Sequence, residues 1–196
     1  MVATYNWFIN NVQDDEVWAW RSTLTKEQCD SIIKYGLSLE SQDAHTNQSD
    51  SVNVSIRNSR ISWIPSNNPE TQWIFQTCAY MVNEMNAKYF NYDLLYLESL
   101  QFTQYSGDDL AFYGKHTDTA FKSHIPRKLS FSILLSDETT FDGGDLLLHC
   151  VNEPMTAPKT QGTAVVFPSF TLHEVTPVTK GTRYSLVGWV VGPRFK

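Results

Sequence analysis

Apolar and polar residues follow two different spacings along this chain, and the change comes near residue 92. Before it, a run of apolar residues recurs every three or four positions, which is the spacing of one helix face. Thr25 stands in front of this run as a candidate N-cap. The pattern predicts a helix over about residues 26–39. The residues on its apolar spacing are Leu24, Cys29, Ile32, Ile33 and Leu37.

A second helical pattern begins at Asn68-Pro69-Glu70, because proline fits the first helical position. From there, mostly apolar and aromatic residues recur at helical spacing to about residue 90. We expect this helix to be long and to cover one side of the domain. The residues at this spacing are Trp73, Ile74, Thr77, Tyr80, Met81, Met85 and Tyr89.

The segment between the two predicted helices, residues 40–58, is rich in Ser, Asn, Gln and Asp and has no period. Long irregular loops in compact domains often act as lids or binding loops. Two hypotheses stay open for this segment: a lid that orders over a substrate, and a stretch without fixed structure.

After residue 92 the apolar residues recur with a period of two, which is typical of strands. Turn signals such as Gly143-Gly144 separate the candidate strands. Many short strands after two helices predict an antiparallel sandwich or barrel that carries helices on one face. The candidate strands are residues 94–105, 110–117, 128–136, 145–150, 162–168, 171–176 and 182–191.

Length and composition predict one globular domain over residues 1–196, with a helical part and loop in 1–92 and a β core in 93–193. The chain has 196 residues, of which 41% are hydrophobic and 18% are charged. The formal net charge of -6 is opposite in sign to that of a typical phosphate-binding protein, so nucleic acid is not expected as a partner.

The cysteines and the apolar runs of the chain predict its cellular compartment. Cys29, Cys78 and Cys150 stand far apart with no CxxC spacing, which favours a reducing compartment. The first residues lack the basic and apolar regions of a secretory signal. No segment approaches 18 consecutive apolar residues, so no membrane partner is expected. These features together predict a cytoplasmic protein.

Candidate metal ligands stand at His116 and Asp118, two positions apart on a predicted strand. Side chains two apart on a strand point to the same face, so these two can converge on one metal ion. His173, at the start of a later strand, completes a set of two histidines and one carboxylate. Such a facial triad is typical of iron(II) sites that leave positions for a chelating cosubstrate and for dioxygen. The other histidines, His45, His124 and His149, are not assigned to the metal.

A candidate cosubstrate anchor follows at Arg183, ten residues after His173. A hairpin centred near residue 178 or 179 would bring Arg183 opposite or close to His173 and onto the same face. A guanidinium binds a carboxylate through paired, charge-assisted hydrogen bonds, so Arg183 is a candidate anchor for a five-carbon diacid. Ser185 shares this face by parity and can add a hydroxyl.

These motifs, taken in order, resemble the prolyl 4-hydroxylase branch of the 2-oxoglutarate/iron(II) oxygenases. The order is HxD, a Gly-Gly turn, Pro…His-Glu-Val, Gly-x-Arg and Trp, and it covers about residues 56–191. Residues 56–64 also look like the segment before the long helix in prolyl hydroxylases of the oxygen-sensing type. The resemblance implies a double-stranded β-helix, also called a jelly roll or cupin-like fold, with helices packed on one face.

The resemblance also implies a role for each candidate residue. His116, Asp118 and His173 would be the catalytic iron ligands, and Arg183 would bind the distal carboxylate of 2-oxoglutarate. Collagen-type enzymes usually carry lysine at the position of Arg183, so a small enzyme of bacterial or viral type fits better. Tyr105 would assist the cosubstrate carboxylate. The residues that look like substrate-side residues are Tyr113, Arg127 and Trp189.

The expected activity is hydroxylation of a prolyl residue in a peptide or protein, with release of succinate and CO2. The expected cofactors are Fe(II), 2-oxoglutarate and O2, with ascorbate as a further one. The expected partner is a proline-containing peptide or protein, and the expected state is a monomer or weak homodimer.

Other functions fit parts of this pattern. A hydroxylase of a free amino acid or other small molecule stays an alternative, because no residue argues against it. A nucleic-acid demethylase of the same superfamily carries a second arginine six residues after the first, where this chain has Trp189. A non-enzymatic cupin-like binding protein needs no triad with Arg183, and a zinc hydrolase leaves Arg183 unexplained.

Overall fold

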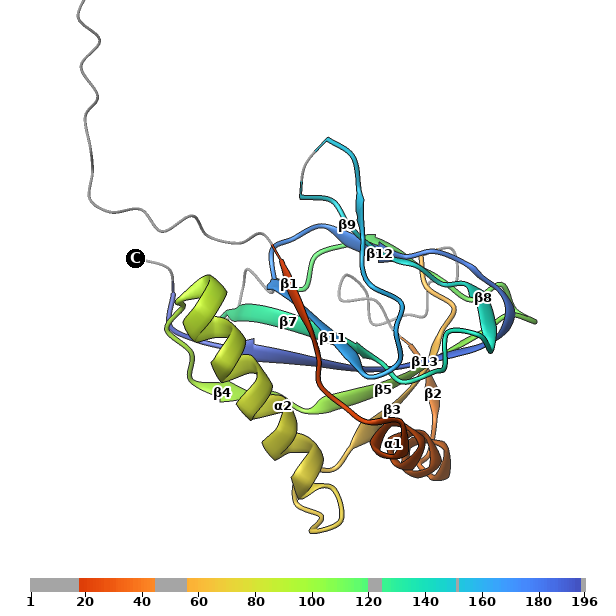
Figure 1. Ribbon diagram of the computed structural model, residues 1–196, viewed down its shortest axis with the longest axis horizontal. Coiled ribbons are helices and arrows are strands. Elements are labelled where there is room, and N and C mark those ends of the chain that lie inside the picture. The colour runs from red at the N-terminus through yellow and green to blue at the C-terminus, as the bar shows by residue number, and fades with distance from the viewer. Residues whose placement is uncertain (1–17, 45–55, 120–124, 151, 195–196) are drawn as a thin grey trace, which may run out of the picture.

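The computed structural model describes residues 18–44, 56–119, 125–150 and 152–194. In these residues, strands form two facing sheets, and two α-helices pack against the larger sheet (Figure 1). The elements in chain order are β1 Ala19–Ser22, α1 Lys26–Ser38, β2 Gln42–Asp43, β3 Arg60–Ile64, α2 Gln72–Met85, the π-helical turn η1 Asn86–Phe90, β4 Tyr96–Leu97, β5 Leu100–Ser106, β6 Tyr113–His116, β7 Arg127–Leu134, β8 Phe141–Gly143, β9 Leu146–Leu148, β10 Met155–Thr156, β11 Thr163–Pro168, β12 His173–Val175 and β13 Val178–Val191.

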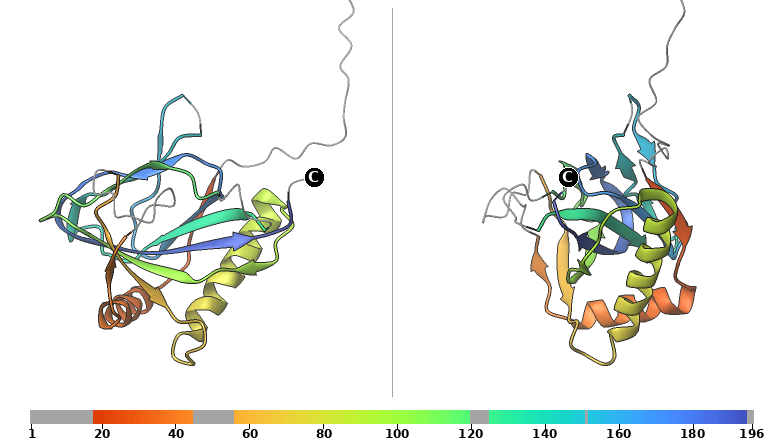
Figure 2. Two further views of the ribbon diagram at one scale, coloured as in Figure 1. Left: turned by 180° about the vertical axis from the view of Figure 1, so that it is seen from behind. Right: turned by 90° about the vertical axis from the view of Figure 1, so that its left-hand side faces the viewer.

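The larger sheet has the strand order β1-β11-β7-β13-β5-β3-β2, with β4 and β8 also paired to β13. The smaller sheet has the order β10-β9-β12-β6. The smaller sheet lies on one side of the larger sheet and the two helices lie on the other, as Figures 1 and 2 show from three directions. This arrangement confirms the predicted double-stranded β-helix with helices on one face.

Two apolar cores hold these layers together, and β11 contributes to both. Ala164 and Val166 pack into the core between the larger sheet and the helices, whereas Val165 and Phe167 pack into the core between the sheets. Alternate residues of a strand point to opposite faces, so a strand buried on both sides is apolar throughout. The cavity described below lies between the two sheets, at the edge of the second core.

Helix α1 begins and ends almost where the sequence predicts. Thr25 and Gln28 form a capping box, in which each side chain bonds the backbone N–H of the other. The helix lies very close to the sheet at Gly36, where an added Cβ would come within 2.4 Å of Cγ of Phe102. Glycine at this position therefore allows α1 to pack directly against β5.

The predicted start of the second helix is wrong by one turn. Residues 68–71 form a turn in which the Thr71 amide bonds the Asn68 carbonyl, and α2 begins only at Gln72. The Asn68 side chain accepts a bond from the Glu70 amide, so Asn68 caps this turn and not the helix. The π-helical turn η1 then extends the helical stretch to Phe90, close to the expected end.

Several strands differ from their expected bounds. The expected strand 94–105 is divided into β4 and β5, and the last strand begins at Val178, four residues earlier than expected. Strands β1, β2, β3, β8 and β10 were not expected. The predicted loop 40–58 contains β2 in its described part, while residues 45–55 of it lie outside the described residues. None of the helices in the described ranges is long and apolar enough to cross a membrane.

Candidate metal and cosubstrate site

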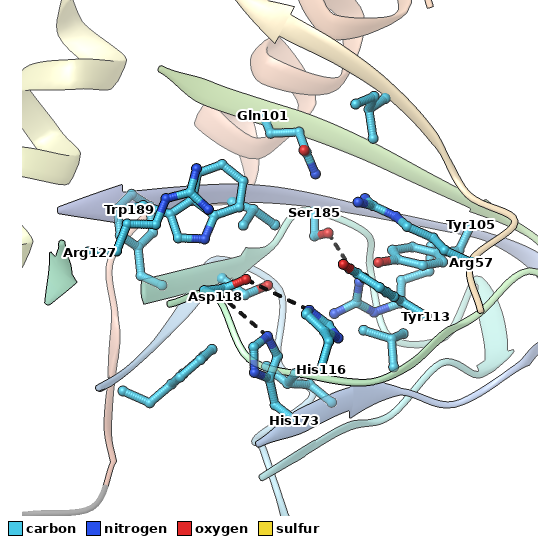
Figure 3. A pocket seen from close by; sticks show the side chains of 18 of the residues that line it. Arg57, Gln101, Tyr105, Tyr113, His116, Asp118, Arg127, His173, Ser185 and Trp189 are labelled. Atoms are coloured by element: carbon cyan, nitrogen blue, oxygen red, sulfur yellow. Dashed lines mark hydrogen bonds and ion pairs between the residues drawn. The ribbon is translucent and has the colours of Figure 1, made fainter. Parts of the chain in front are cut away.

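Strand pairing in the smaller sheet brings the three candidate metal ligands together. His116 ends β6, Asp118 follows two residues later, and His173 begins β12. The two strands are antiparallel neighbours in which His173 pairs directly with His116. One ligand atom from each residue lies within 4.8 Å of the other two. Figure 3 shows the three side chains converging on one point.

Backbone hydrogen bonds fix how both imidazoles face this point. Nδ1 of His116 lies 2.8 Å from the Gly114 carbonyl oxygen, and Nδ1 of His173 lies 2.9 Å from that of Thr171. A carbonyl oxygen only accepts, so each Nδ1 carries the proton and each Nε2 keeps a free lone pair. The Nε2 atoms of His116 and His173 lie 3.8 and 3.6 Å from carboxylate oxygens of Asp118.

Burial keeps His116 in the form that binds a metal. Desolvation, followed by the neighbouring His173, lowers the pKa of His116 to about 3, so the imidazole is neutral near pH 7. A metal needs this neutral form and an ionised carboxylate. Two neutral imidazoles and one carboxylate at this spacing fit a divalent ion such as Fe(II).

Arg183 lies on the larger sheet, across the cavity from the metal ligands. It pairs with Tyr105 of the neighbouring strand β5, and its Nη1 donates to Oγ of Ser185 at 3.1 Å. The guanidinium lies 5.4 Å from the centroid of the Tyr105 ring. The three residues predicted as cosubstrate ligands are therefore neighbours in the structure.

The expected hairpin between the strands of His173 and Arg183 is wrong. His173 belongs to β12 in the smaller sheet and Arg183 to β13 in the larger one, and the chain crosses between the sheets at residues 176–177. The two residues do line one cavity, but they face each other from opposite sheets and are not cross-strand neighbours.

The guanidinium of Arg183 forms no direct ion pair with a described carboxylate, and Asp145 acts on its charge only from beyond ion-pair distance. The side chain of Arg183 is buried. Burial lowers the pKa of Arg183, which reflects the cost of holding a cation away from water. A buried cation of this kind is stabilised by an anion, and here it faces the cavity.

Gly144 makes room for the Arg183 side chain. An added Cβ at Gly144 would lie 2.8 Å from Cδ of Arg183, and the residue has a positive φ of 64°. Gly143 and Gly144 both adopt positive φ, as expected for a turn. This turn therefore supports the cosubstrate side of the cavity as well as reversing the chain.

The cavity between triad and arginine has a volume of about 240 Å³. Besides the triad, the predicted residues that line it are Tyr105, Tyr113, Arg127, Arg183, Ser185 and Trp189. All nine predicted site residues thus lie around one cavity. Figure 3 labels all of them except Arg183.

At the opening of the cavity, which we call its mouth, the guanidinium of Arg127 stacks on the ring of Trp189. The guanidinium carbon lies 4.0 Å from the Trp189 ring centroid, and the same guanidinium forms an ion pair of 2.7 Å with Glu98. The Trp63 ring lies 6.2 Å from that of Trp189. Aromatic and guanidinium planes at one opening form an amphipathic surface suited to a peptide or another planar polar group.

Two cavity residues, Arg57 and Trp63, were not singled out from the sequence. Arg57 lies over the Tyr113 ring at 4.3 Å, and Tyr113 stacks on His116 with ring centroids 3.5 Å apart. Burial raises the pKa of Tyr113 to about 12, so its phenol stays protonated. Both residues fall within residues 56–64, a segment that carries part of the family resemblance. That resemblance was the signal in the sequence that could have identified them.

The geometry defines a class of protein: a double-stranded β-helix with a two-histidine, one-carboxylate site between its sheets. Comparison with known proteins agrees. The model of the 2OG-Fe(II) oxygenase superfamily matches residues 100–191. This match covers just under half of the chain, and the name of the superfamily gives Fe(II) and 2-oxoglutarate as metal and cosubstrate.

Curated relatives are similar over part of their length. A PKHD-type hydroxylase of Picosynechococcus sp. is 37% identical over 94 residues, which cover 48% of this chain and 42% of the relative. A PKHD-type hydroxylase of Prochlorococcus marinus is 41% identical over 78 residues, which cover 40% of this chain and 35% of the relative. The chain thus matches less than half the length of these relatives.

Solved structures share the fold. A Pseudomonas putida prolyl-4-hydroxylase superposes with a TM-score of 0.71 at 22% identity, covering 91% of this chain and 94% of that one. A Trichoplax adhaerens prolyl hydroxylase, solved with a hypoxia inducible factor peptide fragment, superposes with a TM-score of 0.71 at 18% identity. The superposition covers 90% of this chain and 84% of that one.

Proposed function

We propose that this chain is an Fe(II)- and 2-oxoglutarate-dependent oxygenase that hydroxylates a prolyl residue in a peptide or protein. Succinate and CO2 would be the other products. One observation carries the proposal: the buried guanidinium of Arg183, which forms no direct ion pair with a described carboxylate, faces a two-histidine, one-carboxylate cluster across a cavity of about 240 Å³. The names of the hydroxylase relatives and prolyl hydroxylase neighbours support the reaction type.

In this proposal, His116, Asp118 and His173 hold the metal. When bound, Fe(II) with 2-oxoglutarate and O2 supplies the oxidising chemistry that breaks an unactivated C–H bond. The carbonyls that accept from both Nδ1 atoms keep each Nε2 directed at the metal without rearrangement. The protein thus contributes a preformed ligand set.

Arg183 would hold the distal carboxylate of the cosubstrate, with Ser185 and Tyr105 beside it. A guanidinium offers two parallel donors to a carboxylate, and burial strengthens the pair because little water competes with it. The Ser185 hydroxyl, which accepts from Nη1 at 3.1 Å, fixes the guanidinium plane. A cosubstrate so anchored reaches towards the triad on the facing sheet.

Substrate would enter at the mouth formed by Arg127, Trp189 and Tyr113. Trp189 and Tyr113 offer flat apolar surfaces, and Arg127 offers donors for peptide carbonyl groups. A docked peptide covering this opening would exclude bulk water from the reacting carbon.

The test is anaerobic titration with Fe(II) and then 2-oxoglutarate, followed by aerobic succinate release with a panel of proline-containing peptides. We expect peptide-dependent succinate formation and a hydroxylated prolyl residue by mass spectrometry, with and without ascorbate. His116→Ala should abolish iron binding and turnover. His149→Ala is the matched control, because His149 pairs with Glu174 and does not line the cavity.

Two outcomes would overturn parts of this proposal. Turnover retained in His116→Ala would remove this residue from the ligand set. Succinate release that no peptide accelerates would instead favour a hydroxylase of a free amino acid or other small molecule.

A further inference from the structure

A second groove of about 530 Å³ lies beside the mouth of the cavity. Its walls come from the end of β3, the first turns of α2, and β4 with the residues that follow it. The residues that line it are Trp63, Ser66, Phe75, Tyr96, Leu97, Glu98 and Ser99. None of these is a candidate ligand of the metal or cosubstrate.

The groove adjoins the cavity at two points. Trp63 lines both spaces. Glu98, which lines the groove, forms the ion pair with Arg127, which lines the cavity. A chain leaving the cavity past Trp63 and Arg127 therefore enters the groove directly.

Strand geometry sets the separation of the two spaces. Gln101 lines the cavity and Ser99, two positions earlier along the same chain, lines the groove. Two residues of extended chain span about 7 Å. A peptide in extended conformation that passes Gln101 would thus reach the groove about two residues further on.

Four of the seven groove residues are apolar or aromatic, and the two largest of them are exposed. Tyr96 is 55% exposed and Trp63 is 43% exposed, although both are large aromatic residues. Among the described strands, β4 pairs only with β13, because β3 ends at Ile64, opposite Leu100. Exposed aromatic residues in a concave surface commonly mark a binding site, and the unshared side of β4 suits an extended chain.

We propose that this groove binds the segment of the peptide substrate next to the hydroxylated residue, and that it selects an apolar or aromatic side chain at one short, fixed offset from that residue. This inference rests on the proposed function, since it assumes a peptide at the metal site. The occupant is an extended peptide because the groove adjoins the cavity and lies at a sheet edge. Tyr96 and Trp63 provide the contact surface for its side chain.

The test uses the full chain and a pool of peptides with one central proline and randomised flanks that extend beyond the groove. One readout is the sequence of peptides captured by the immobilised chain, and the other is the sequence of peptides that gain a hydroxyl group. Tyr96→Ser removes the aromatic wall of the groove without changing a cavity residue. Tyr80→Ser is the matched control, because Tyr80 is 62% exposed on α2 and does not line the groove.

The wild-type chain and Tyr80→Ser should enrich apolar side chains at one fixed offset from the proline, in both readouts. Tyr96→Ser should lower that enrichment by about tenfold, as expected for loss of one well-packed aromatic contact. Hydroxylation without preference at any flanking position would overturn the groove proposal and leave the proposed function standing. An equal loss of enrichment in Tyr96→Ser and Tyr80→Ser would also overturn the groove proposal. So would a concentration-dependent dimer that Tyr96→Ser abolishes, because a second copy of the chain would then be the occupant of the groove. If no peptide is captured or hydroxylated, both proposals fail.

Discussion

Gly144→Ala tests whether the position of Arg183 controls cosubstrate binding. The new Cβ would lie 2.8 Å from Cδ of Arg183 and equally close to Cγ2 of Val178. Ordinary contact begins at about 3.4 Å, so the Arg183 side chain must move by roughly 0.6 Å. The variant therefore displaces the guanidinium and leaves its charge and hydrogen-bonding groups intact.

The expected magnitude follows from this displacement. A misplacement of about 1 Å of a group that positions a substrate can cost about a hundredfold in rate, so a shift of roughly 0.6 Å should lower kcat/KM for 2-oxoglutarate by about tenfold. We expect most of this loss as a higher KM, because Arg183 holds the cosubstrate and does not touch the reacting carbon. Alanine at a φ of 64° adds about 1–2 kcal/mol of backbone strain, which lowers the free energy of unfolding. The KM for peptide should change little, because the mouth is not altered.

The assay is succinate formation as a function of 2-oxoglutarate concentration, with urea unfolding measured in parallel. Gly162→Ala is the control: its φ is 79°, its Cβ would collide with the Leu24 carbonyl oxygen, and the three atoms nearest to that Cβ all belong to Leu24 and none to Arg183. It should lose stability and keep its KM for 2-oxoglutarate. An unchanged KM in Gly144→Ala, with stability lowered in both variants, would refute the claim that Gly144 positions Arg183.

Three further predictions follow from single contacts. His173→Ala should weaken Fe(II) binding by more than the roughly 10- to 100-fold that loss of an outer hydrogen-bond partner costs, measured by anaerobic titration; binding within tenfold of wild type would contradict it. Glu98→Ala should raise the KM for peptide about three- to fivefold and leave kcat unchanged, because Arg127 loses its partner of 2.7 Å; a fall in kcat alone would contradict this. Gly36→Ala should lower the free energy of unfolding by about 1–2 kcal/mol despite its better helix propensity, because its Cβ overlaps Phe102; greater stability in urea would show that α1 can shift.

The sequence predicts most where the pattern is local. Helix α1 begins where Thr25 and Gln28 cap it, and the period of two after residue 92 locates most of the β core. The start of α2 was misplaced because Asn68-Pro69-Glu70 forms a turn, which carries the same residue types as a helix start. The short strands β2 and β10 are defined by their partners and have no period of their own.

In the candidate site, too, local spacing could be predicted and contacts between distant segments could not. His116 and Asp118 could be paired from their spacing alone, because two positions on a strand share a face. Arg57 carries no spacing signal of this kind. It reaches the cavity only because its segment pairs with Tyr113. A contact that depends on tertiary placement of an irregular segment is not visible in the period of the sequence.

The cavity has room for a diacid because Arg183 lies on the facing sheet and not on a strand next to that of His173. Directly opposed residues on neighbouring strands have Cβ atoms about 4.5–5.5 Å apart, which leaves no room for a diacid between His173 and Arg183. Facing sheets lie about 10 Å apart. The crossing at residues 176–177 moves the chain from the smaller sheet to the larger one, so the metal ligands and the guanidinium gain this larger separation. A five-carbon diacid needs a gap of that order, and a hairpin would have closed it.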